Sequence, residues 1–244
     1  MGGRLSGKAA LITGASQGIG RGIAAAYLHE GARVFLCARN REALARTAGE
    51  LARIGPPLDF RATDVGDRAQ AEALVQAALA RFPDLEVLVN NASILGKRAL
   101  LAEVEVATWD EVLRINLSGI FYVIRPLLSH FIGRGSGSII NVSSSVGRKG
   151  KPYWGPYAVS KFGLEGLTQV LAEELRPHGI RVNSVNPGAT RTAMRAAAYP
   201  SEDPLGLPTP EEIADVFVYL ASDESAALTG QALEARDHLK PAAK

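Results

Sequence analysis

The sequence predicts an α/β protein with a doubly wound parallel sheet, arranged in three layers, α/β/α. One observation is that short apolar runs alternate with longer runs of helical periodicity along most of the chain. Another is a glycine-rich loop at residues 14–20, between the first predicted strand and the first predicted helix. The composition, 47% hydrophobic and 21% charged, suffices to bury both faces of such a sheet. We therefore expect residues 1–244 to form one domain.

The first half of the chain repeats a strand–helix unit. Strands are predicted at residues 8–13, 33–38 and 58–63, and helices at 22–28, 42–54 and 68–82. Because such units return the chain to the same edge of a sheet, their strands run parallel. Asp67 is expected to cap the third helix with its carboxylate.

The second half continues the alternation. Strands are predicted at residues 85–90, 138–142 and 180–185, and helices at 104–131, 157–177 and 210–221. The short segment 193–208 is expected to be irregular and to lie on the substrate side, because it contains three prolines. The tail at residues 236–244 shows no pattern that requires it to be ordered.

The loop after the first strand has the composition of a phosphate-binding turn. Gly14, Gly18 and Gly20 permit positive φ angles and close approach of the backbone to a pyrophosphate. The helix that follows presents its N–H groups to such an anion. The spacing differs from G-x-G-x-x-G, and taken alone the loop fits a plain turn equally well.

The end of the second strand indicates which dinucleotide would bind. About twenty residues beyond the glycines, where an acidic residue would hold a ribose 2′-hydroxyl, the chain has Ala38 followed by Arg39. A guanidinium matches the geometry of a 2′-phosphate, which favours NADP, and Ser16 and Gln17 would add polar contacts. The alternative is that Arg39 is a solvated cation beside Arg41.

Polar residues also follow the third and fourth strands. Asp64 could accept a hydrogen bond from an adenine amino group, or cap the next helix. The run 90–93, Asn-Asn-Ala-Ser, could flank a ribose, or be only a turn. Asn116 lies in an apolar helical pattern, where an asparagine is usually either a hydrogen-bonded core group or a residue that bends the helix.

The stretch from Ser143 to Lys161 carries the strongest chemical signal. Pro156 suits a first helical turn, so that Tyr157 and Lys161 stand one turn apart on one helix face. The ammonium is expected to lower the pKa of the phenol, which makes Tyr157 a proton donor. The basic residues of the loop, at positions 148, 149 and 151, could attract an acidic substrate or be solvated.

Composition argues against several other classes of protein. The net charge of +2 is spread along the chain without a basic stripe, which argues against nucleic-acid binding. The four histidines are far apart and Cys37 is the only cysteine, so neither a metal site nor a disulfide is expected, and a reducing cytoplasm fits. The apolar run 9–12 is too short for a signal peptide or a membrane span.

Taken together, the motifs resemble those of the short-chain dehydrogenase/reductase family over residues 8–222. They are Thr13-Gly14-x-x-x-Gly18-Ile19-Gly20, Asn90-Asn91-Ala92, Asn116, Ser144, Tyr157-x-x-x-Lys161 and Asn186-Pro187-Gly188-x-x-x-Thr192, in that order and spacing. The resemblance implies a single Rossmann domain with a sheet of about seven parallel strands. It also implies hydride transfer between NADP(H) and a small-molecule carbonyl or alcohol, by a homo-oligomer, a dimer or a tetramer.

The resemblance also assigns roles to residues. Tyr157 corresponds to the general acid for ketone reduction, and Ser144 to the donor that holds the carbonyl oxygen. Lys161 would hold the nicotinamide ribose and lower the pKa of Tyr157, and Asn116 would position a water that links Lys161 to solvent. The residues expected to contact the cofactor are Gly14, Ser16, Gln17, Gly18, Ile19, Gly20, Arg39, Asp64, Val65, Asn90, Ala92, Tyr157, Lys161, Pro187, Gly188 and Thr192.

The chain departs from the family pattern in three places. Ser93 stands where the motif Asn-Asn-Ala-Gly has glycine. The segment after Thr192 is short where many members insert a helical lid over the substrate. The C-terminal part, residues 229–237, begins like the last family strand but lacks its Asp-Gly-Gly, which leaves the subunit contacts open.

The expected activity is therefore NADP(H)-dependent interconversion of a carbonyl and a secondary alcohol. Reduction of 3-oxoacyl thioesters is the first substrate hypothesis, because the commonest bacterial members perform it and the basic loop would accept a phosphopantetheine carrier. A sugar, a polyol or a steroid-like alcohol is the alternative, with Tyr153 as a candidate wall of the substrate site. A hypothesis of another class is a non-catalytic NADP-binding sensor or scaffold on the same fold.

Overall fold

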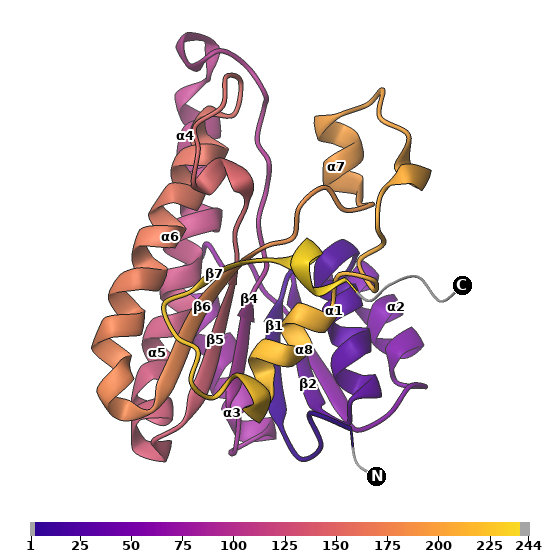
Figure 1. Cartoon of the computed structure of the whole chain (residues 1–244), viewed down its shortest axis with the longest axis vertical. Helices are drawn as coiled ribbons and strands as arrows, with labels where there is room; N and C mark the ends of the chain where they lie inside the picture. Colours follow the sequence, from indigo (N-terminus) through magenta and orange to yellow (C-terminus); the bar gives the residue numbers. More distant parts are fainter. Residues whose placement is uncertain (1–2, 240–244) are drawn as a thin grey trace.

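The computed structural model describes residues 3–239 and contains one parallel sheet of seven strands with the order β3-β2-β1-β4-β5-β6-β7 (Figure 1). The strands are β1 (Ala9–Thr13), β2 (Arg33–Ala38), β3 (Leu58–Ala62), β4 (Val87–Asn90), β5 (Gly137–Val142), β6 (Ile180–Asn186) and β7 (Ala232–Glu234). Every paired neighbour runs parallel. The predicted fold class, a doubly wound sheet of the Rossmann type, is confirmed.

Helices cover both faces of this sheet. They are α1 (Gly18–His29), α2 (Arg41–Leu51), α3 (Arg68–Arg81), α4 (Val106–Leu113), α5 (Gly119–Arg134), α6 (Gly155–Leu175), α7 (Ala193–Ala198) and α8 (Asp215–Ala221). One apolar cluster packs α1, α2 and α8 against the sheet, and a second packs α3, α5 and α6. The hydroxyl of Tyr27 in α1 donates to the backbone oxygen of Phe217 in α8 at 2.9 Å, which joins two helices of the first layer.

The order of the strands places a crevice beside β1. The chain moves outward from β1 to β2 and β3, then returns to pair β4 with the other side of β1. At such a reversal the loops that leave the carboxyl ends of neighbouring strands diverge, and ligands bind between them. The loops after Thr13 and Asn90 therefore border the same crevice.

The long helical pattern predicted at 104–131 is present, but it is not one regular α-helix. A π-helical segment, Arg114–Ser118, separates α4 from α5 and contains Asn116. The stretch Val106–Arg134 is long and apolar enough to span a membrane by length and composition, and an 18-residue window within it has a mean hydropathy of 1.3. In this fold, the apolar face of α5, which includes Ile120, Val123 and Leu127, packs into the core, and that burial accounts for its composition.

Several predicted boundaries in the C-terminal part are wrong. The segment 193–208 is not irregular throughout, because α7 forms within it before Pro200 is reached. The last helix begins at Asp215, after turns at 210–214, rather than at Pro210. The expected disordered tail is ordered at its start, where Ala235–His238 form a 3₁₀ turn, and residues 240–244 lie outside the described residues. Asp67 caps α3 as predicted and accepts from the Gln70 N–H at 3.0 Å.

Candidate active site

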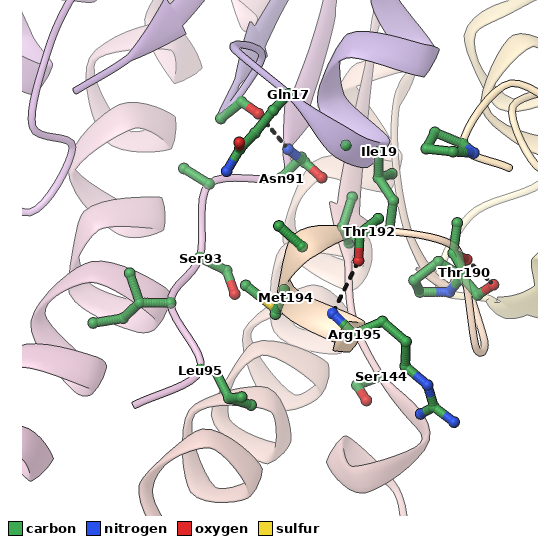
Figure 2. Close-up of a pocket in the computed structure, with 18 of the residues that line it drawn as sticks. Gln17, Ile19, Asn91, Ser93, Leu95, Ser144, Thr190, Thr192, Met194 and Arg195 are labelled. Atoms are coloured by element: carbon green, nitrogen blue, oxygen red, sulfur yellow. Dashed lines mark hydrogen bonds between the residues drawn. The ribbon is translucent and has the colours of Figure 1, made fainter. Parts of the chain in front are cut away.

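A cavity of about 650 Å³ opens at the carboxyl edge of the sheet (Figure 2). Its wall is built by the segments that leave β1 to β6, together with parts of α6 and α7. Among the residues on that wall are Arg39, Ser144, Tyr157 and Lys161. The glycine turn and the Tyr–Lys pair, about 140 positions apart in sequence, therefore border one cavity.

The glycine turn is held against the strand exit of β4. Gly14 has a φ of +67°, and a Cβ atom built there would lie 2.8 Å from the Ala92 Cα. Gly20 is not on the cavity wall, and a Cβ there would lie 2.4 Å from the Gly14 backbone oxygen. Gly14 and Gly18 thus shape the ligand-facing turn, whereas Gly20 serves packing. Gln17, the N-cap of α1, makes no side-chain capping bond, so its side chain leaves the first N–H groups of the helix available to an anion.

Arg39 is positioned to meet an anion at the β2 side of the cavity. Its side chain is 53% exposed, and its ion pair with Glu111 is long, 3.8 Å between Nη1 and Oε1. The next residue, Asn40, caps α2 by accepting from the Ala43 N–H at 2.9 Å. The cap anchors the backbone next to Arg39 and leaves most of the guanidinium donors for a ligand.

Two residues predicted to contact the cofactor have side chains that are occupied elsewhere. Asp64 pairs with Arg114 at 2.9 Å and accepts from the Gly66 N–H, and it is not on the cavity wall. Asn90 is buried, donates to the Asn141 Oδ1 at 2.9 Å within the sheet, and is likewise not on the wall. Of the other residues predicted to contact the cofactor in this part of the site, Gly20 is not on the wall, whereas the cavity is lined by Gly14, Ser16, Gln17, Gly18, Ile19, Val65 and Ala92.

The segment after β4 is anchored on both sides of Ser93. The side-chain amide of Asn91 donates to the backbone oxygens of Thr13 and Gly14, each at 3.0 Å. The Ala92 N–H donates to the Thr13 hydroxyl at 3.1 Å. Sequence analysis assigned no role to Asn91 beyond its motif, although both Asn91 and Ser93 line the cavity.

Asn116 is entirely buried and holds the same segment from the other end. Its Oδ1 accepts from the Ile94 N–H at 2.8 Å, and its Nδ2 donates to the Ile94 carbonyl at 2.8 Å and to the Ser160 hydroxyl at 3.2 Å. The asparagine is thus a satisfied core group, one of the two possibilities left open by the sequence. Its side chain does not line the cavity.

Tyr157 and Lys161 lie on the cavity-facing side of α6. Tyr157 is 8% exposed, and the Lys161 Nζ lies 5.6 Å from the centroid of its ring. Lys161 donates to the Val142 carbonyl at 2.7 Å, and two of its three N–H donors have no further hydrogen bond among the described residues. The predicted pairing of the phenol with the ammonium is present in the structure.

The expected direction of the Tyr157 pKa is wrong for the chain without ligands. Burial raises the pKa of Tyr157 to about 12, while hydrogen bonding to the hydroxyls of Ser93 and Ser144 acts in the lowering direction. Burial also lowers the pKa of Lys161 to about 8, opposed by the charge of Glu165. Spacing along a helix predicts which groups meet but not how far they are removed from water.

Of Ser143, Ser144 and Ser145, only Ser144 is both accessible from the cavity and the cap of a local turn. It caps the 3₁₀ turn Ser145–Gly147 and accepts from the Val146 N–H at 3.4 Å. Ser143 also lines the cavity but is 2% exposed, and Ser145 is exposed and not on the wall. A Cβ at Gly147 would lie 2.9 Å from Lys161 atoms, so the turn needs glycine to pack against α6.

The substrate side of the cavity is largely apolar. Leu95, Trp154, Met194 and Ala198 line it, and Figure 2 shows Leu95 and Met194 on different segments of the wall. Tyr153, the wall residue suggested by the sequence, is 51% exposed and is not on the wall. Its φ of +71° is unusual for a residue with a side chain and accompanies a turn that buries Trp154 instead.

Aromatic and cationic side chains fix α7 over this part of the cavity. The Arg98 guanidinium lies 4.9 Å from the ring centroids of both Trp154 and Tyr199, and it donates to the Ala198 carbonyl. Arg195 lies 3.8 Å from the Tyr199 centroid and pairs with Glu202 at 2.6 Å. The short segment after Thr192 therefore covers the site, despite lacking a long insertion.

The basic loop after Ser145 does not face the cavity. Arg148 pairs with Glu165 at 3.3 Å and with Glu234 at 2.6 Å, and Lys151 donates to the Tyr199 hydroxyl at 2.9 Å. None of the three basic residues, at positions 148, 149 and 151, lines the cavity. These positions do not support the hypothesis that the three residues attract an acidic substrate, because two of the residues make contacts within the fold.

The remaining predicted cofactor residues come from the segment after β6. Pro187, Gly188 and Thr192 line the cavity, and Thr192 caps α7 by accepting from the Arg195 N–H at 3.1 Å (Figure 2). Gly188 has a φ of +69°, and a Cβ there would lie 3.1 Å from the Arg236 Nε. Arg191, which sequence analysis did not single out, also lines the cavity.

Comparisons with known proteins agree with this architecture. The family model for short chain dehydrogenases matches residues 8–203. The chain is 38% identical over 234 residues to the uncharacterized oxidoreductase YciK of Escherichia coli, covering 95% of this chain and 92% of YciK. It is 39% identical over 239 residues to the 3-oxoacyl-[acyl-carrier-protein] reductase FabG of Thermotoga maritima, covering 94% and 96% of the two chains.

A solved structure is equally similar. It is a short chain dehydrogenase from Shigella flexneri 2a in complex with NADP, with 37% identity, a TM-score of 0.90, and coverage of 97% of this chain and 100% of that one. The matches extend over the sheet, the glycine turn and the Tyr157–Lys161 helix together. This chain is an oxidoreductase of the short-chain dehydrogenase/reductase family.

Proposed function

We propose that the protein interconverts a carbonyl and a secondary alcohol with NADP(H) as its cofactor. The observation that carries the proposal is the single cavity that joins Arg39 and the glycine turn to Ser144, Tyr157 and Lys161. Such a cavity can hold both ends of a dinucleotide, with the nicotinamide beside a proton donor. NADPH bound there would supply the hydride for the carbonyl carbon.

The residues of the cavity fit this cofactor. Gly14 and Gly18 leave room for a pyrophosphate at the N-terminus of α1, where no side chain caps the helix. Arg39, with its long ion pair to Glu111, has donors for a 2′-phosphate. The similar chain from Shigella flexneri was solved with NADP, which supports the same preference here.

Tyr157 is the proposed general acid for reduction. Burial keeps its phenol protonated, so that the hydroxyl can donate its proton to the carbonyl oxygen as that oxygen gains negative charge. Ser144, which lines the same cavity, donates a hydrogen bond to that oxygen. In the reverse direction, the phenolate of Tyr157 accepts the alcohol proton.

Lys161 is proposed to hold the nicotinamide ribose and to stabilise the phenolate that Tyr157 leaves behind. Its ammonium is fixed by the Val142 carbonyl and keeps two further donors for the ribose hydroxyls. Asn116 would act through its backbone and a water molecule, because its side-chain amide is used by Ile94 and Ser160. It is therefore a positioning residue in this mechanism.

We further propose a 3-oxoacyl thioester as the first substrate to test. The apolar wall made by Leu95, Trp154 and Met194 suits an acyl chain, and the Thermotoga relative is named as a 3-oxoacyl reductase. The basic loop adds no support, since its residues lie away from the cavity. A polyol, sugar or steroid-like alcohol is the alternative substrate. We expect the protein to act as a homo-oligomer in the cytoplasm.

Oxidation of NADPH in the presence of a carbonyl panel tests the activity. The panel contains acetoacetyl thioesters, diketones and quinones, and turnover with at least one of them is expected. Tyr157→Phe should abolish turnover while leaving NADPH affinity nearly unchanged. Tyr153→Phe, which removes the neighbouring exposed hydroxyl, is the matched control and should retain activity.

A non-catalytic NADP-binding sensor makes the opposite prediction. Such a protein would bind NADPH tightly and oxidise it with no member of the panel. Retention of full activity by Tyr157→Phe would instead refute the assignment of the general acid, even if the protein were an enzyme.

A further inference from the structure

Ser93 places a hydroxyl group on the cavity wall where the Asn-Asn-Ala-Gly pattern has no side chain. It follows β4 directly after Ala92, and Figure 2 shows it on a different segment of the wall from Ser144. A second serine hydroxyl therefore reaches the cavity from the segment that follows β4.

The position of this serine is fixed by its neighbours. On one side, the Ala92 N–H donates to the Thr13 hydroxyl at 3.1 Å. On the other side, Ile94 exchanges two hydrogen bonds of 2.8 Å with the buried side chain of Asn116. Because the backbone is anchored at both adjacent residues, the Ser93 hydroxyl can move only by rotation about its own χ1 angle.

The segment that carries Ser93 packs beside the phenol of Tyr157, because Leu95, two residues further on, packs against the apolar cluster that contains Trp154 and Tyr157. Ser93, Ser144 and Tyr157 line the same cavity, and hydrogen bonding to both serines acts to lower the pKa of the phenol against the effect of burial. A phenol that has lost its proton needs donors, and hydroxyls supply them at low cost in reorganisation when they are already in place.

The charged and titratable groups around Tyr157 leave room for such a role. Lys161 lies 5.6 Å from its ring, and Glu165 acts on Lys161 from one helical turn further along α6. On the other side, the Trp154 ring lies 5.7 Å from the Tyr157 ring, and beyond it Arg98 contacts the titratable ring of Tyr199. The Lys161 ammonium thus comes from α6, whereas the Ser93 and Ser144 hydroxyls come from the segments after β4 and β5.

We propose that Ser93 is a positioning residue that aims the Tyr157 hydroxyl at the substrate carbonyl and that shares with Ser144 the stabilisation of the Tyr157 phenolate. This inference rests on the proposed function. Ser144 remains the donor to the substrate oxygen. With glycine in place of Ser93, the phenolate would lose one preorganised donor.

A titration of Tyr157 tests this role without any need for turnover. Protein containing ζ-¹³C-tyrosine is titrated by NMR with and without NADP⁺, and the Tyr157 signal is identified by its absence from Tyr157→Phe. In Ser93→Ala and Ser93→Gly, the pKa of Tyr157 should rise by about one unit, a tenfold change in its ionisation constant. Ser93→Thr keeps a hydroxyl and should restore most of the shift.

Ser145→Ala is the matched control, because it removes an exposed serine hydroxyl that is not on the cavity wall, and it should leave the titration unchanged. Thermal melting of every variant checks that the fold is retained. An unshifted Tyr157 titration in both Ser93→Ala and Ser93→Gly would overturn the proposal. Because this measurement needs no substrate, it can be interpreted even if every carbonyl in the panel fails.

Kinetics supply a second readout once a substrate is found. In alcohol oxidation by Ser93→Ala, the pH at which kcat reaches half of its plateau should move upward with the Tyr157 titration, with KM nearly unchanged. A uniform loss of kcat at every pH, or a rise in KM alone, would show that Ser93 supports the fold or the substrate instead, and either result would contradict the proposal.

Discussion

Lys161 donates a hydrogen bond of 2.7 Å to the backbone oxygen of Val142, the last residue of β5. The bond holds a buried ammonium at the edge of the cavity, and burial lowers its pKa to about 8. A lysine in the unfolded chain has a pKa of about 10.4. Between these two values the unfolded chain binds the Lys161 proton and the folded chain does not, so the Lys161 contribution to stability increases as pH rises.

The melting temperature of Lys161→Met should reveal this contribution. Methionine fills similar space without a charge. The gain in stability of the variant over the wild type should therefore be greatest near pH 7 and should shrink as pH rises toward 10. The difference in melting temperature between variant and wild type, followed by circular dichroism without cofactor, should therefore fall over this range. The range ends near pH 10 because, above the lysine pKa of about 10.4, the unfolded chain also loses this proton and the contribution stops changing. A difference that does not change with pH would contradict the lowered pKa of Lys161.

Arg39→Ala should lower affinity for NADPH much more than affinity for NADH. The lost charge-assisted hydrogen bonds to a 2′-phosphate correspond to about a tenfold loss or more. Isothermal titration of both cofactors gives the ratio directly. Arg41→Ala removes an exposed cation at the first residue of α2 that is not on the cavity wall, and it should leave the ratio unchanged. Equal losses for both cofactors in Arg39→Ala would mean that Arg39 does not contact the 2′-phosphate.

Gly20→Ala and Gly49→Ala should change stability in opposite directions. A Cβ at Gly20 would lie 2.4 Å from the Gly14 oxygen, so the glycine turn must shift, which should cost about 1–3 kcal/mol. A Cβ at Gly49, inside α2, meets nothing within 4 Å, and alanine there should stabilise the helix by about 0.5–1 kcal/mol. Urea unfolding of both variants measures the two changes in the free energy of unfolding. Stabilisation by Gly20→Ala would refute the close approach of Gly20 to the Gly14 oxygen.

Arg98→Met should loosen α7 from the cavity. The change removes the cation–π contacts with Trp154 and Tyr199 and the bond to the Ala198 carbonyl, and such contacts are worth about 0.5–2 kcal/mol. Trypsin should therefore cut the segment 191–195 several-fold faster, as followed by mass spectrometry. Lys97→Met, at the exposed neighbouring position, should leave the rate of cleavage unchanged. Equal cleavage rates in the wild type and Arg98→Met would contradict the role of this contact.

Periodicity predicted the central strands of the sheet because they are buried on both faces and read largely as continuous apolar runs. The strand at 33–38 was predicted with the bounds that the structure gives to β2. Helix α7 was missed because the three prolines of 193–208 argued against a long helix, yet six residues fit before Pro200. Proline restricts the residues before it but does not exclude a single short helix upstream.

The sequence predicted those site residues that belong to motifs and line the cavity. It did not predict the properties that depend on burial, namely the pKa values and which polar side chains are already hydrogen-bonded. Side-chain spacing placed Tyr157 beside Lys161, but only the packed structure shows that burial raises the pKa of the phenol. Asn90 and Asp64 carry the right chemical groups, yet the Asn90 amide nitrogen is used by Asn141 and the Asp64 carboxylate by Arg114, and neither side chain lines the cavity. The wall residue Trp154 could not be told from Tyr153 by sequence, because the choice depends on one backbone angle.

The π-helical turn at Arg114–Ser118 makes the active-site wall dependent on the number of residues in a helix. A π-helical turn accommodates one residue more than the α-helical repeat, and each residue of an α-helix turns the chain by about 100°. Deleting one residue there would let α4 and α5 join as a continuous rod, at the cost of rotating one of them by that angle. The amide of Asn116 would then leave the backbone of Ile94, and the wall that holds Ser93 would lose its anchor. The π-helical turn is thus a locally unfavourable helix geometry, and its effect is to hold the segment of Ser93 in place on the wall of the active site.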